Sequence, residues 1–384
     1  MRRIYLDYNA TTPLDPNVFE AMLPYLREHF GNPSSGHWFG AQAKAAVEHA
    51  REQVAALLGA DPSEIVFTSG GSESDNWAIK GIAEANRDRG NHIITSQIEH
   101  PAVLNTCRYL EGQGFRVTYL PVDGYGQVDP DDVVRAVTSR TILISIMHAN
   151  NEAGTIQPIA AIGAMARERG IYFHTDAAQS VGKFPTDVEQ LQVDLLTVAG
   201  HKLYAPKGVG ALYVRRGTHI APLIHGAGHE GGRRAGTENV AGVVGLGQAC
   251  AIAAETMAET VERLRALRDR LHEGLATRVE GLHLNGHPTQ RLPNTLNLSF
   301  EGLDGNTLLA ALPEIAASTG SACHAGITEP SPVLTAMGVP PEIAVGAVRF
   351  SLGKWNDQEE IDQAVELVAG KVAGLRSSAL QNRR

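Results

Sequence analysis

Short apolar runs alternate with longer segments through the first part of the chain. The runs are rich in β-branched and aliphatic residues, and most of the segments between them are long enough for a helix. The seven runs are Ile65 to Thr68, His92 to Ser96, Arg116 to Leu120, Thr141 to Met147, Ile171 to Thr175, Leu195 to Val198 and Gly210 to Val214. This alternation predicts βαβ units, and hence an α/β fold with a mostly parallel seven-stranded sheet that has helices on both faces.

The pattern changes after Gly247. A long helical stretch from about Gln248 to Arg278 leads out of the sheet region. Beyond it we expect a smaller α+β domain, to which the N-terminal segment returns. Its predicted strands and helix are Thr295–Phe300, Val348–Leu352 and Glu359–Val372. The expected division is a large domain over residues 15–257 and a small domain made of residues 1–14 and 258–384.

Composition narrows the class of protein. The chain has 384 residues, 43% hydrophobic residues and 40 glycines, which is typical of an α/β enzyme with two unequal domains. No apolar stretch approaches the roughly 18 to 20 uncharged residues that span a bilayer, and the N-terminus does not resemble a signal peptide, so we expect a cytoplasmic enzyme. The net charge of −9 argues against nonspecific binding of nucleic acid. The three cysteines are far apart and lack C-x-x-C spacing, so they predict neither a disulfide framework nor a zinc site.

Two residues that follow apolar runs carry the clearest chemical signal. Asp176 ends one run, and Lys202 lies in the Gly-His-Lys turn after a later one. Together they could hold pyridoxal phosphate, because lysine forms a Schiff base with it and a carboxylate keeps its ring nitrogen protonated. A buried capping residue and a surface lysine are the alternative interpretation.

Other polar residues follow the neighbouring strands. A Gly- and Ser-rich turn opens a helix at Gly71 and Ser72, where backbone N–H groups could bind a phosphate. His100 follows the next strand and could stack on an aromatic cofactor or carry a proton. Asn151 and Gln179 offer amides that could hydrogen-bond a ring oxygen. Taken singly, each feature also fits a purely structural role.

Two further residues suggest a substrate site and a nucleophile. Arg349 is a charged residue inside an apolar strand, and its donors suit a substrate carboxylate, with a strand-edge salt bridge as the alternative. Cys323 lies in a loop of small residues without helix or strand pattern, and the adjacent His324 could raise its thiolate fraction. Cys107 and Cys250 lie in helical stretches among apolar neighbours, so we interpret them as buried residues.

In order and nearly end to end, these motifs resemble those of the cysteine desulfurases of the NifS/IscS type. These enzymes depend on pyridoxal phosphate and share the class V aminotransferase fold, a variant of fold type I. The matching segments are Tyr5–Pro13, Phe30–Ser35, Thr68–Ser74, Asn150–Glu152, Asp176–Gln179, Gly200–Lys202, Arg234–Asn239 and the loop around Cys323.

The resemblance implies a role for each matching residue around the cofactor. Lys202 would form the Schiff base, Asp176 would face the pyridine nitrogen, and His100 would stack on the ring. Gln179, with Asn151, would lie near the ring oxygen. The residues implied for the phosphate are Gly71, Ser72, His201 and, from the second subunit of a homodimer, Thr237.

The resemblance also implies the reaction. Arg349, helped by Asn9 or Asn32, would bind the substrate carboxylate. After Lys202 removes a proton from L-cysteine, Cys323 would take the sulfur as a persulfide and L-alanine would leave. The persulfide sulfur would pass to an acceptor or scaffold protein for iron–sulfur cluster assembly or tRNA thiolation.

Two departures from the family pattern leave alternatives open. Ala199 stands where members commonly have Ser, so one hydroxyl contact to the phosphate should be absent, which can lower cofactor affinity. His324 follows Cys323 in place of the usual Thr, and Ala-Cys-His is also similar to selenocysteine lyases, which release selenide and L-alanine. An aminotransferase or a kynureninase-like hydrolase on the same fold would need no cysteine. A scaffold that only docks a sulfur carrier would have an empty cofactor site.

Overall fold

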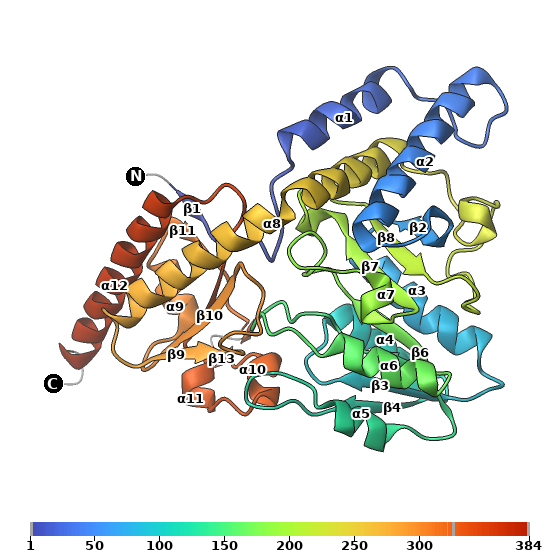
Figure 1. The fold of residues 1–384 in the computed structure, drawn as a ribbon. Coiled ribbons are helices and arrows are strands. Elements are labelled where there is room, and N and C mark those ends of the chain that lie inside the picture. Colours follow the sequence, from blue (N-terminus) through green and yellow to red (C-terminus); the bar gives the residue numbers. More distant parts are fainter. Residues whose placement is uncertain (1–2, 321, 325–326, 382–384) are drawn as a thin grey trace.

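A seven-stranded sheet is the centre of the computed structural model, which describes residues 3–320, 322–324 and 327–381 (Figure 1). Its strand order is β2-β8-β7-β6-β5-β3-β4, in which β8 runs antiparallel to both of its neighbours and the other pairs are parallel. The strands are β2 (Ile65–Thr68), β3 (His92–Ser96), β4 (Arg116–Leu120), β5 (Thr141–Ser145), β6 (Tyr172–Asp176), β7 (Leu195–Ala199) and β8 (Gly210–Val214). Each strand coincides with a predicted apolar run to within two residues, so the predicted fold class is confirmed.

Helices cover both faces of this sheet. Within β2, Ile65 and Phe67 pack into the core on one face and Val66 packs on the other, because successive side chains of a strand point to opposite sides. One face is covered by α1 (Pro16–Arg27), α2 (Trp38–Leu58), α5 (Pro130–Ala136), α6 (Ile159–Glu168), α7 (Val188–Leu191) and the first part of α8 (Val240–Ala276), and the other by α3 (Gly71–Ala85) and α4 (Pro101–Glu111). Because both faces are buried, the strands are continuous apolar runs in the sequence.

Helix α8 begins at Val240, whereas the sequence predicted a start near Gln248. The Asn239 side chain caps it by accepting a hydrogen bond from the Gly242 N–H at 3.2 Å. Glycines in the first turns hid this start, because glycine is a poor helix former in isolation. Their role here is close packing, which a sequence window does not show.

Contacts of α8 with α2 show why glycine is needed in those turns. A Cβ atom at Gly247 would lie 2.7 Å from the Cβ of Ala50 in α2, so a larger residue would force the two helices apart. Contrary to the sequence expectation, part of α8 is long and apolar enough to cross a membrane, and 44% of that stretch is buried inside the protein. Its contacts with α1 and α2 make it a core helix.

A second sheet lies at the C-terminal end of α8 (Figure 1). It consists of β9 (Leu282–Asn285), β10 (Thr295–Phe300) and β14 (Ala347–Ser351), with α9 (Gly305–Ala310) and α12 (Gln358–Gln381) packed nearby. Strands β10 and β14 and helix α12 confirm predicted elements, and β9 was not predicted. Strand β1 (Ile4–Tyr5) pairs in parallel with β11 (Ile315–Ala316), so the N-terminus returns to this region as expected.

The two sheets have separate cores that α8 joins. Cys250 of α8 belongs to the core of the large sheet, and Leu264 of the same helix belongs to the core of the small one. Cys250 lies before the expected domain boundary at residue 257, and Leu264 lies after it. The domain division itself stays a prediction.

The segment around Cys323 is a hairpin, which corrects the expected irregular loop. Strand β12 (Ala322–His324) pairs antiparallel with β13 (Ile327–Glu329), and Cys323 lies opposite Thr328. Residues 321, 325 and 326 and the side chains of residues 322–328 lie outside the described part of the structure. Sequence periodicity does not reveal this pairing, because it rests on backbone hydrogen bonds and not on alternating apolar side chains. Helices α10 (Pro332–Ala336) and α11 (Pro341–Ala344) follow it.

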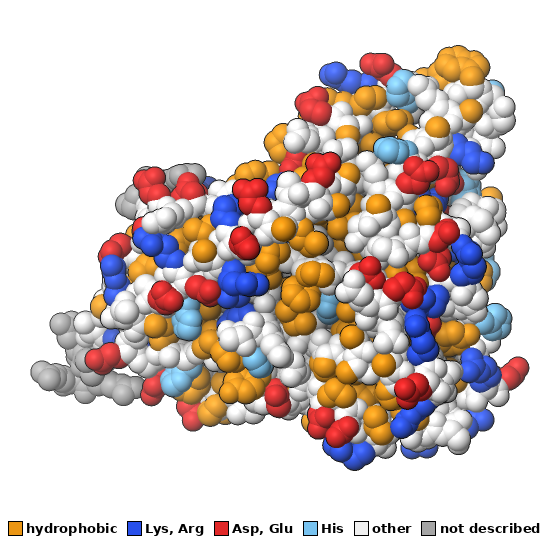
Figure 2. Space-filling view, in the orientation of Figure 1, with side chains coloured by type: hydrophobic (Ala, Val, Ile, Leu, Met, Phe, Trp, Pro, Cys, Tyr) orange, Lys and Arg blue, Asp and Glu red, His pale blue; other side chains and the backbone are white. Residues whose placement is uncertain are grey.

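Charged side chains are spread over the surface. On the face that Figure 2 shows, acidic and basic side chains are interspersed over both sheet regions. An exposed aromatic cluster lies near the start of α2, where the rings of Trp38 and Phe39 stack with centroids 3.6 Å apart and Phe30 packs on Phe39. Of this cluster, Phe30 belongs to a segment that matches the family pattern, and Trp38 and Phe39 follow that segment.

Candidate active site

A cavity of about 640 Å³ lies at the carboxyl ends of the parallel strands, where ligands bind in sheets of this kind. Asp176 and Ala199 line it from the ends of β6 and β7, and His100 lines it from the connection after β3. Asn9 and Arg349, from the small-sheet region, close the opposite side. The predicted site residues that line it are Asn9, Gly71, Ser72, His100, Asn151, Asp176, Gln179, His201, Lys202 and Arg349.

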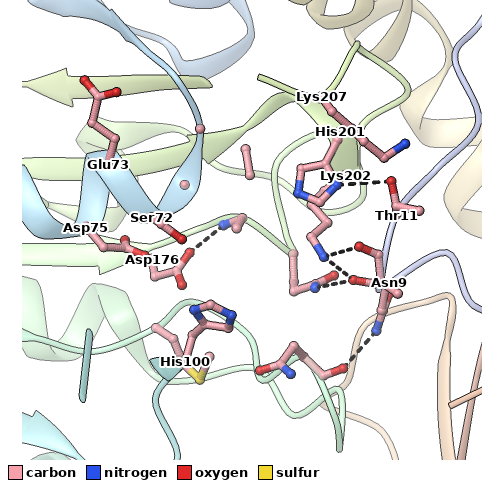
Figure 3. Close-up of a pocket in the computed structure, with 18 of the residues that line it drawn as sticks. Asn9, Thr11, Ser72, Glu73, Asp75, His100, Asp176, His201, Lys202 and Lys207 are labelled. Atoms are coloured by element: carbon pink, nitrogen blue, oxygen red, sulfur yellow. Dashed lines mark hydrogen bonds between the residues drawn. The ribbon is translucent and has the colours of Figure 1, made fainter. Parts of the chain in front are cut away.

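Lys202 lies in a tight turn, η2 (Gly200–Lys202), directly after β7. Its ammonium group donates to the backbone carbonyls of Asn9 and Ala10, the latter at 2.7 Å (Figure 3). Burial, and then the charge of Arg349, lower the pKa of Lys202 to about 8. The amine therefore loses its proton far more easily than an exposed lysine and can act as a nucleophile or base.

Asp176 faces the cavity on the side away from Lys202 (Figure 3). One of its carboxylate oxygens accepts a hydrogen bond from the Ala178 N–H at 2.9 Å. Burial raises the pKa of Asp176, while this hydrogen bond and the nearby His100 and Lys202 act to lower it. A buried carboxylate in this position suits a protonated ring nitrogen.

Asp75 was not predicted and lies next to Asp176 at the same end of the cavity (Figure 3). It comes from α3, is 2% exposed, and its Oδ1 finds no hydrogen-bond partner in the described part of the chain. Burial, and then the charge of Asp176, raise the pKa of Asp75 well above its ordinary value. Since two adjacent buried carboxyls do not both ionise, we assign the proton to Asp75 and the charge to Asp176, which accepts the Ala178 N–H and is stabilised by the charges of His100 and Lys202. The only sequence signal was its place one turn after Ser72.

His100 caps helix α4, and this sets its tautomer. Its Nδ1 accepts a hydrogen bond from the Ala102 N–H at 3.1 Å, so in the neutral ring the proton is assigned to Nε2. Burial lowers the pKa of His100; the Asp176 carboxylate opposes this shift, and the charge of Lys202 adds to it. The imidazole beside the cavity is therefore neutral, as stacking on a cationic ring system requires.

The N-terminus of α3 forms the anion-binding end of the cavity. Within the described part of the chain no side chain caps this 15-residue helix, so the N–H groups of Gly71 and Ser72 are available at the cavity wall. Lys207, which was not predicted, also lines this region and adds positive charge. A Cβ at Gly71 would lie 3.3 Å from the Cβ of Ala199. Ala199 therefore packs against this turn. A serine at position 199 would have placed its hydroxyl here, and alanine has none.

His201 lies on the same side of the cavity as Lys207 (Figure 3). Its Nδ1 is 3.2 Å from the Thr11 hydroxyl. Burial, followed by the charge of Lys202, lowers the pKa of His201 to about 4, so the ring is neutral near pH 7. A neutral imidazole can still donate a hydrogen bond to a phosphate oxygen.

Gln179 and Asn9 form one hydrogen-bonded wall. The Gln179 Nε2 donates to the Asn9 carbonyl at 3.0 Å. The side-chain Nδ2 of Asn9 donates to Thr295 Oγ1 at 2.8 Å and to the Asn151 carbonyl at 3.2 Å. Both Nδ2 hydrogens of Asn9 are therefore engaged, and its amide supports the wall instead of facing a substrate carboxylate.

Arg349 makes a salt bridge, which was one interpretation of the sequence. It also lines the cavity, as the other interpretation, a carboxylate-binding residue, requires. Its Nη2 donates to the Asp7 carboxylate at 2.8 Å and its Nη1 to the Asn151 carbonyl at 3.0 Å. Its buried Nε has no partner among the described atoms. The guanidinium is thus held in place at the cavity wall.

Two predicted site residues do not line this cavity in the single chain. Asn32 is exposed, and its side chain accepts from the Ser34 N–H at 2.9 Å in a local turn. Thr237 is exposed and lines a separate cavity of about 200 Å³, which shares Ser69 and Gly208 with the main one. Their assigned roles stay predictions.

The Cys323 hairpin starts and ends beside the cavity wall. The Ser331 hydroxyl, just after the hairpin, donates to the Glu152 carboxylate at 2.5 Å. Gly320, just before it, lies so close to the same carboxylate that a Cβ would be 2.0 Å from Glu152 Oε2. Glu152 follows Asn151, which lines the cavity. Both ends of the segment are therefore next to the site, although the Cys323 side chain is outside the described structure.

The other two cysteines are buried, as predicted. Cys107 in α4 and Cys250 in α8 are fully enclosed by apolar neighbours. Burial raises the pKa of each thiol to about 12. Neither can supply a thiolate near neutral pH.

The chain is similar to known proteins over nearly its whole length. The sequence pattern described as aminotransferase class V matches residues 4–364. A cysteine desulfurase IscS of Methanosarcina thermophila is 57% identical over 378 residues, covering 98% of this chain and 93% of the relative. The cysteine desulfurase IscS of Dictyoglomus turgidum is 51% identical over 378 residues, covering 98% and 96%.

Solved structures show the same fold. A NifS-like protein has a TM-score of 0.91 and 43% sequence identity, and the match covers 97% of this chain and 99% of that one. A structure of SspA in complex with cysteine has a TM-score of 0.81 and 41% identity, covering 92% of this chain and 100% of that one.

Proposed function

This chain belongs to the class V aminotransferase family and is a pyridoxal phosphate-dependent enzyme, and we propose that it is a cysteine desulfurase that transfers the sulfur of L-cysteine to Cys323. The observation that carries the proposal is the meeting of Lys202, Asp176 and Arg349 at one cavity. The relatives that are cysteine desulfurases match over nearly the full length of the chain.

The residues of the cavity fit pyridoxal phosphate. Asp176 is a buried carboxylate with room beside it for a cationic nitrogen, and Lys202 has the easily deprotonated amine that a covalent link requires. Gly71, Ser72 and His201 would hold the phosphate at the uncapped start of α3. His100 would stack on the ring, and Gln179 would hydrogen-bond its phenolic oxygen. When bound, the cofactor supplies a sink for the electrons released at the substrate Cα.

The chain's own residues orient the substrate and move its protons. Arg349, which lines the cavity, would bind the α-carboxylate, with Asp7 and the Asn151 carbonyl fixing the guanidinium. The Lys202 amine would accept the proton from the substrate Cα, a transfer that its lowered pKa favours near neutral pH. Asp176 would hold the balancing negative charge.

Cys323 would act as the sulfur acceptor. In the net reaction the substrate Cβ–S bond breaks, an S–S bond forms on Cys323, and the thiol proton replaces sulfur on the carbon skeleton. The products are L-alanine and a Cys323 persulfide, so atoms and electrons balance. Cys107 and Cys250 are buried with raised thiol pKa values, which leaves Cys323 as the candidate thiol.

We also propose a cytoplasmic homodimer that delivers persulfide sulfur to an acceptor protein. Thr237 is exposed and lines the smaller cavity that adjoins Ser69 and Gly208. In a dimer packed at this cavity, Thr237 of each subunit would reach the phosphate site of the other subunit and complete it. Light scattering of the holoenzyme at several concentrations tests the dimer, and a chain that stays monomeric would contradict it.

The deciding experiment is alanine formation from L-cysteine and from L-selenocysteine, measured side by side. The enzymes to compare are the wild type, Cys323→Ala and the matched control Cys250→Ala. We expect Cys323→Ala to lose alanine formation from L-cysteine while it keeps the absorbance of the bound cofactor. Undiminished turnover of L-cysteine by Cys323→Ala would overturn the role of this thiol. Turnover of L-selenocysteine only would instead indicate a selenocysteine lyase, which the names of the relatives do not favour.

A further inference from the structure

Lys183 is a buried lysine directly behind the wall of the active site. It belongs to the turn that follows β6, and it is 7% exposed. Its Nζ donates to the side-chain Oε1 of Gln179 at 3.2 Å. Within the described residues, no carboxylate lies at ion-pair distance from it. The side chain is therefore held by an amide, which is an unusual partner for a buried lysine.

The charged groups around Lys183 do not explain its burial. Lys202 and Arg349 are both cations, and both lower the pKa of Lys183. Asp15 and Lys354, which line the same small cavity of about 30 Å³, form an ion pair with each other. Burial is the largest cause of a lowered Lys183 pKa, which is about 7. A methionine would fill this space without the cost of burying an amine, so fold stability does not account for the lysine.

The Lys183 contact sets the orientation of the Gln179 amide. An amide can be turned over with almost no change of shape, so its partners decide which atom faces where. A charged lysine has hydrogens to donate and no lone pair with which to accept, so the atom that faces it is the acceptor Oε1. The Nε2 then faces the Asn9 carbonyl at 3.0 Å, and its second hydrogen remains for the cavity that Gln179 lines.

The same hydrogen bonds connect this wall to the reactive lysine. The Asn9 carbonyl that accepts from Gln179 also accepts from the Lys202 ammonium. Lys183, Gln179 and Lys202 thus form one chain of hydrogen bonds through that carbonyl. A change at Lys183 reaches the cofactor site through Gln179.

We propose that Lys183 is a positioning residue, whose hydrogen bond to Oε1 holds the Gln179 amide so that Nε2–H points at the ring oxygen of the bound cofactor. The proposal deepens the proposed function, because it takes that ring oxygen to lie beside Gln179. Lys183 itself does not touch the cofactor or the substrate. Its contribution is to present a donor, and not an acceptor, to a negatively charged oxygen.

The test is the pH titration of the cofactor absorbance in the holoenzyme, without substrate. A donor at the ring oxygen stabilises its negative charge when the Lys202–cofactor linkage loses its proton. In Lys183→Met this donor is no longer held in place, so the linkage should keep its proton to higher pH. We expect the midpoint to rise by roughly 0.5 to 1 pH unit, the shift that one ordinary hydrogen bond supports.

A double-mutant cycle shows whether Lys183 acts through Gln179. In the Gln179→Leu background, Lys183→Met should add no further shift of the midpoint. An unchanged midpoint in Lys183→Met, or an undiminished shift in the Gln179→Leu background, would overturn the proposal. If Lys183→Met does not fold, Lys183→Leu serves for the same comparison. Since the titration uses no L-cysteine, its outcome is distinguishable from failure of the alanine assay.

Discussion

The carboxyl groups of Asp75 and Asp176 lie next to each other at one end of the active-site cavity, although one comes from a helix and the other from a strand. Asp176 accepts a backbone hydrogen bond, whereas Asp75 Oδ1 has no hydrogen-bond partner among the described atoms. The pair can hold one negative charge at low cost but not two. Under the proposed function, this arrangement would leave a single carboxylate to balance a single protonated ring nitrogen.

Asp75→Asn should stabilise the apoenzyme relative to the wild type, and this difference should grow as the pH rises. The folded-state pKa of Asp75 is raised, so above pH about 4 the unfolded state binds fewer protons than the folded state and wild-type stability declines with pH. The asparagine is uncharged and removes this dependence. The difference in melting temperature between variant and wild type should grow between pH 5 and pH 8, on the order of that linkage window. The exposed Asp88→Asn is the control, and an equal trend in both variants would contradict the assignment.

Asp176→Asn should keep the cofactor but lose most of the activity. The proposed covalent link through Lys202 and the proposed phosphate site would be unchanged, while the ring nitrogen would lose the carboxylate proposed to keep it protonated. We expect alanine formation to fall by about 100-fold or more, as when a single charge-stabilising group is removed from an active site. Single-turnover assays on variant enzyme with full cofactor absorbance measure this. A rate near that of the wild type would show that Asp176 is not the nitrogen partner.

Uptake of pyridoxal phosphate by the apoenzyme should become faster as the pH rises and should level off above about pH 8. This is the value to which burial lowers the pKa of Lys202. Below that pH the amine is protonated, and only its neutral form attacks the aldehyde. Recovery of the cofactor absorbance at several pH values measures the rate, with a small alkylamine as the reference for the cofactor's own titration. Arg349→Met removes a charge that lowers this pKa, so its levelling-off point should move to higher pH. A levelling-off point near the ordinary lysine value in the wild type would contradict the prediction.

Glu230→Ala should strongly destabilise the fold. Glu230 is buried, accepts from Arg51 Nη1 at 2.7 Å and from the Phe67 N–H at 3.1 Å, and so joins α2 to β2. Its removal leaves the buried guanidinium without its buried carboxylate and with only the half-exposed Glu48 as an ionic partner, which costs about 3 to 5 kcal/mol of unfolding free energy. Urea denaturation of the apoenzyme measures this. Asp362→Ala, which breaks an ion pair at the surface, is the matched control and should change little. Equal effects of the two variants would count against the importance of the buried pair.

The sequence by itself determined the seven strands and predicted most of the residues that meet at the main cavity. A strand buried on both faces must be apolar along its length, so β2 to β8 are visible as runs. Gly71, Asp176 and Lys202 follow such runs, and the carboxyl ends of parallel strands meet at one edge of the sheet. Their proximity therefore follows from local patterns.

Only the tertiary structure decided the partners of these residues. Asp75 beside Asp176, Lys183 behind Gln179, and the engaged amide of Asn9 are contacts between segments whose local sequence has no pattern for them. The same holds for the early start of α8, which depends on close packing against α2, and for the hairpin at Cys323, which depends on backbone pairing. Periodicity reports which face of an element is buried. The neighbour that an individual polar atom meets, and hence its charge state, is set by long-range packing.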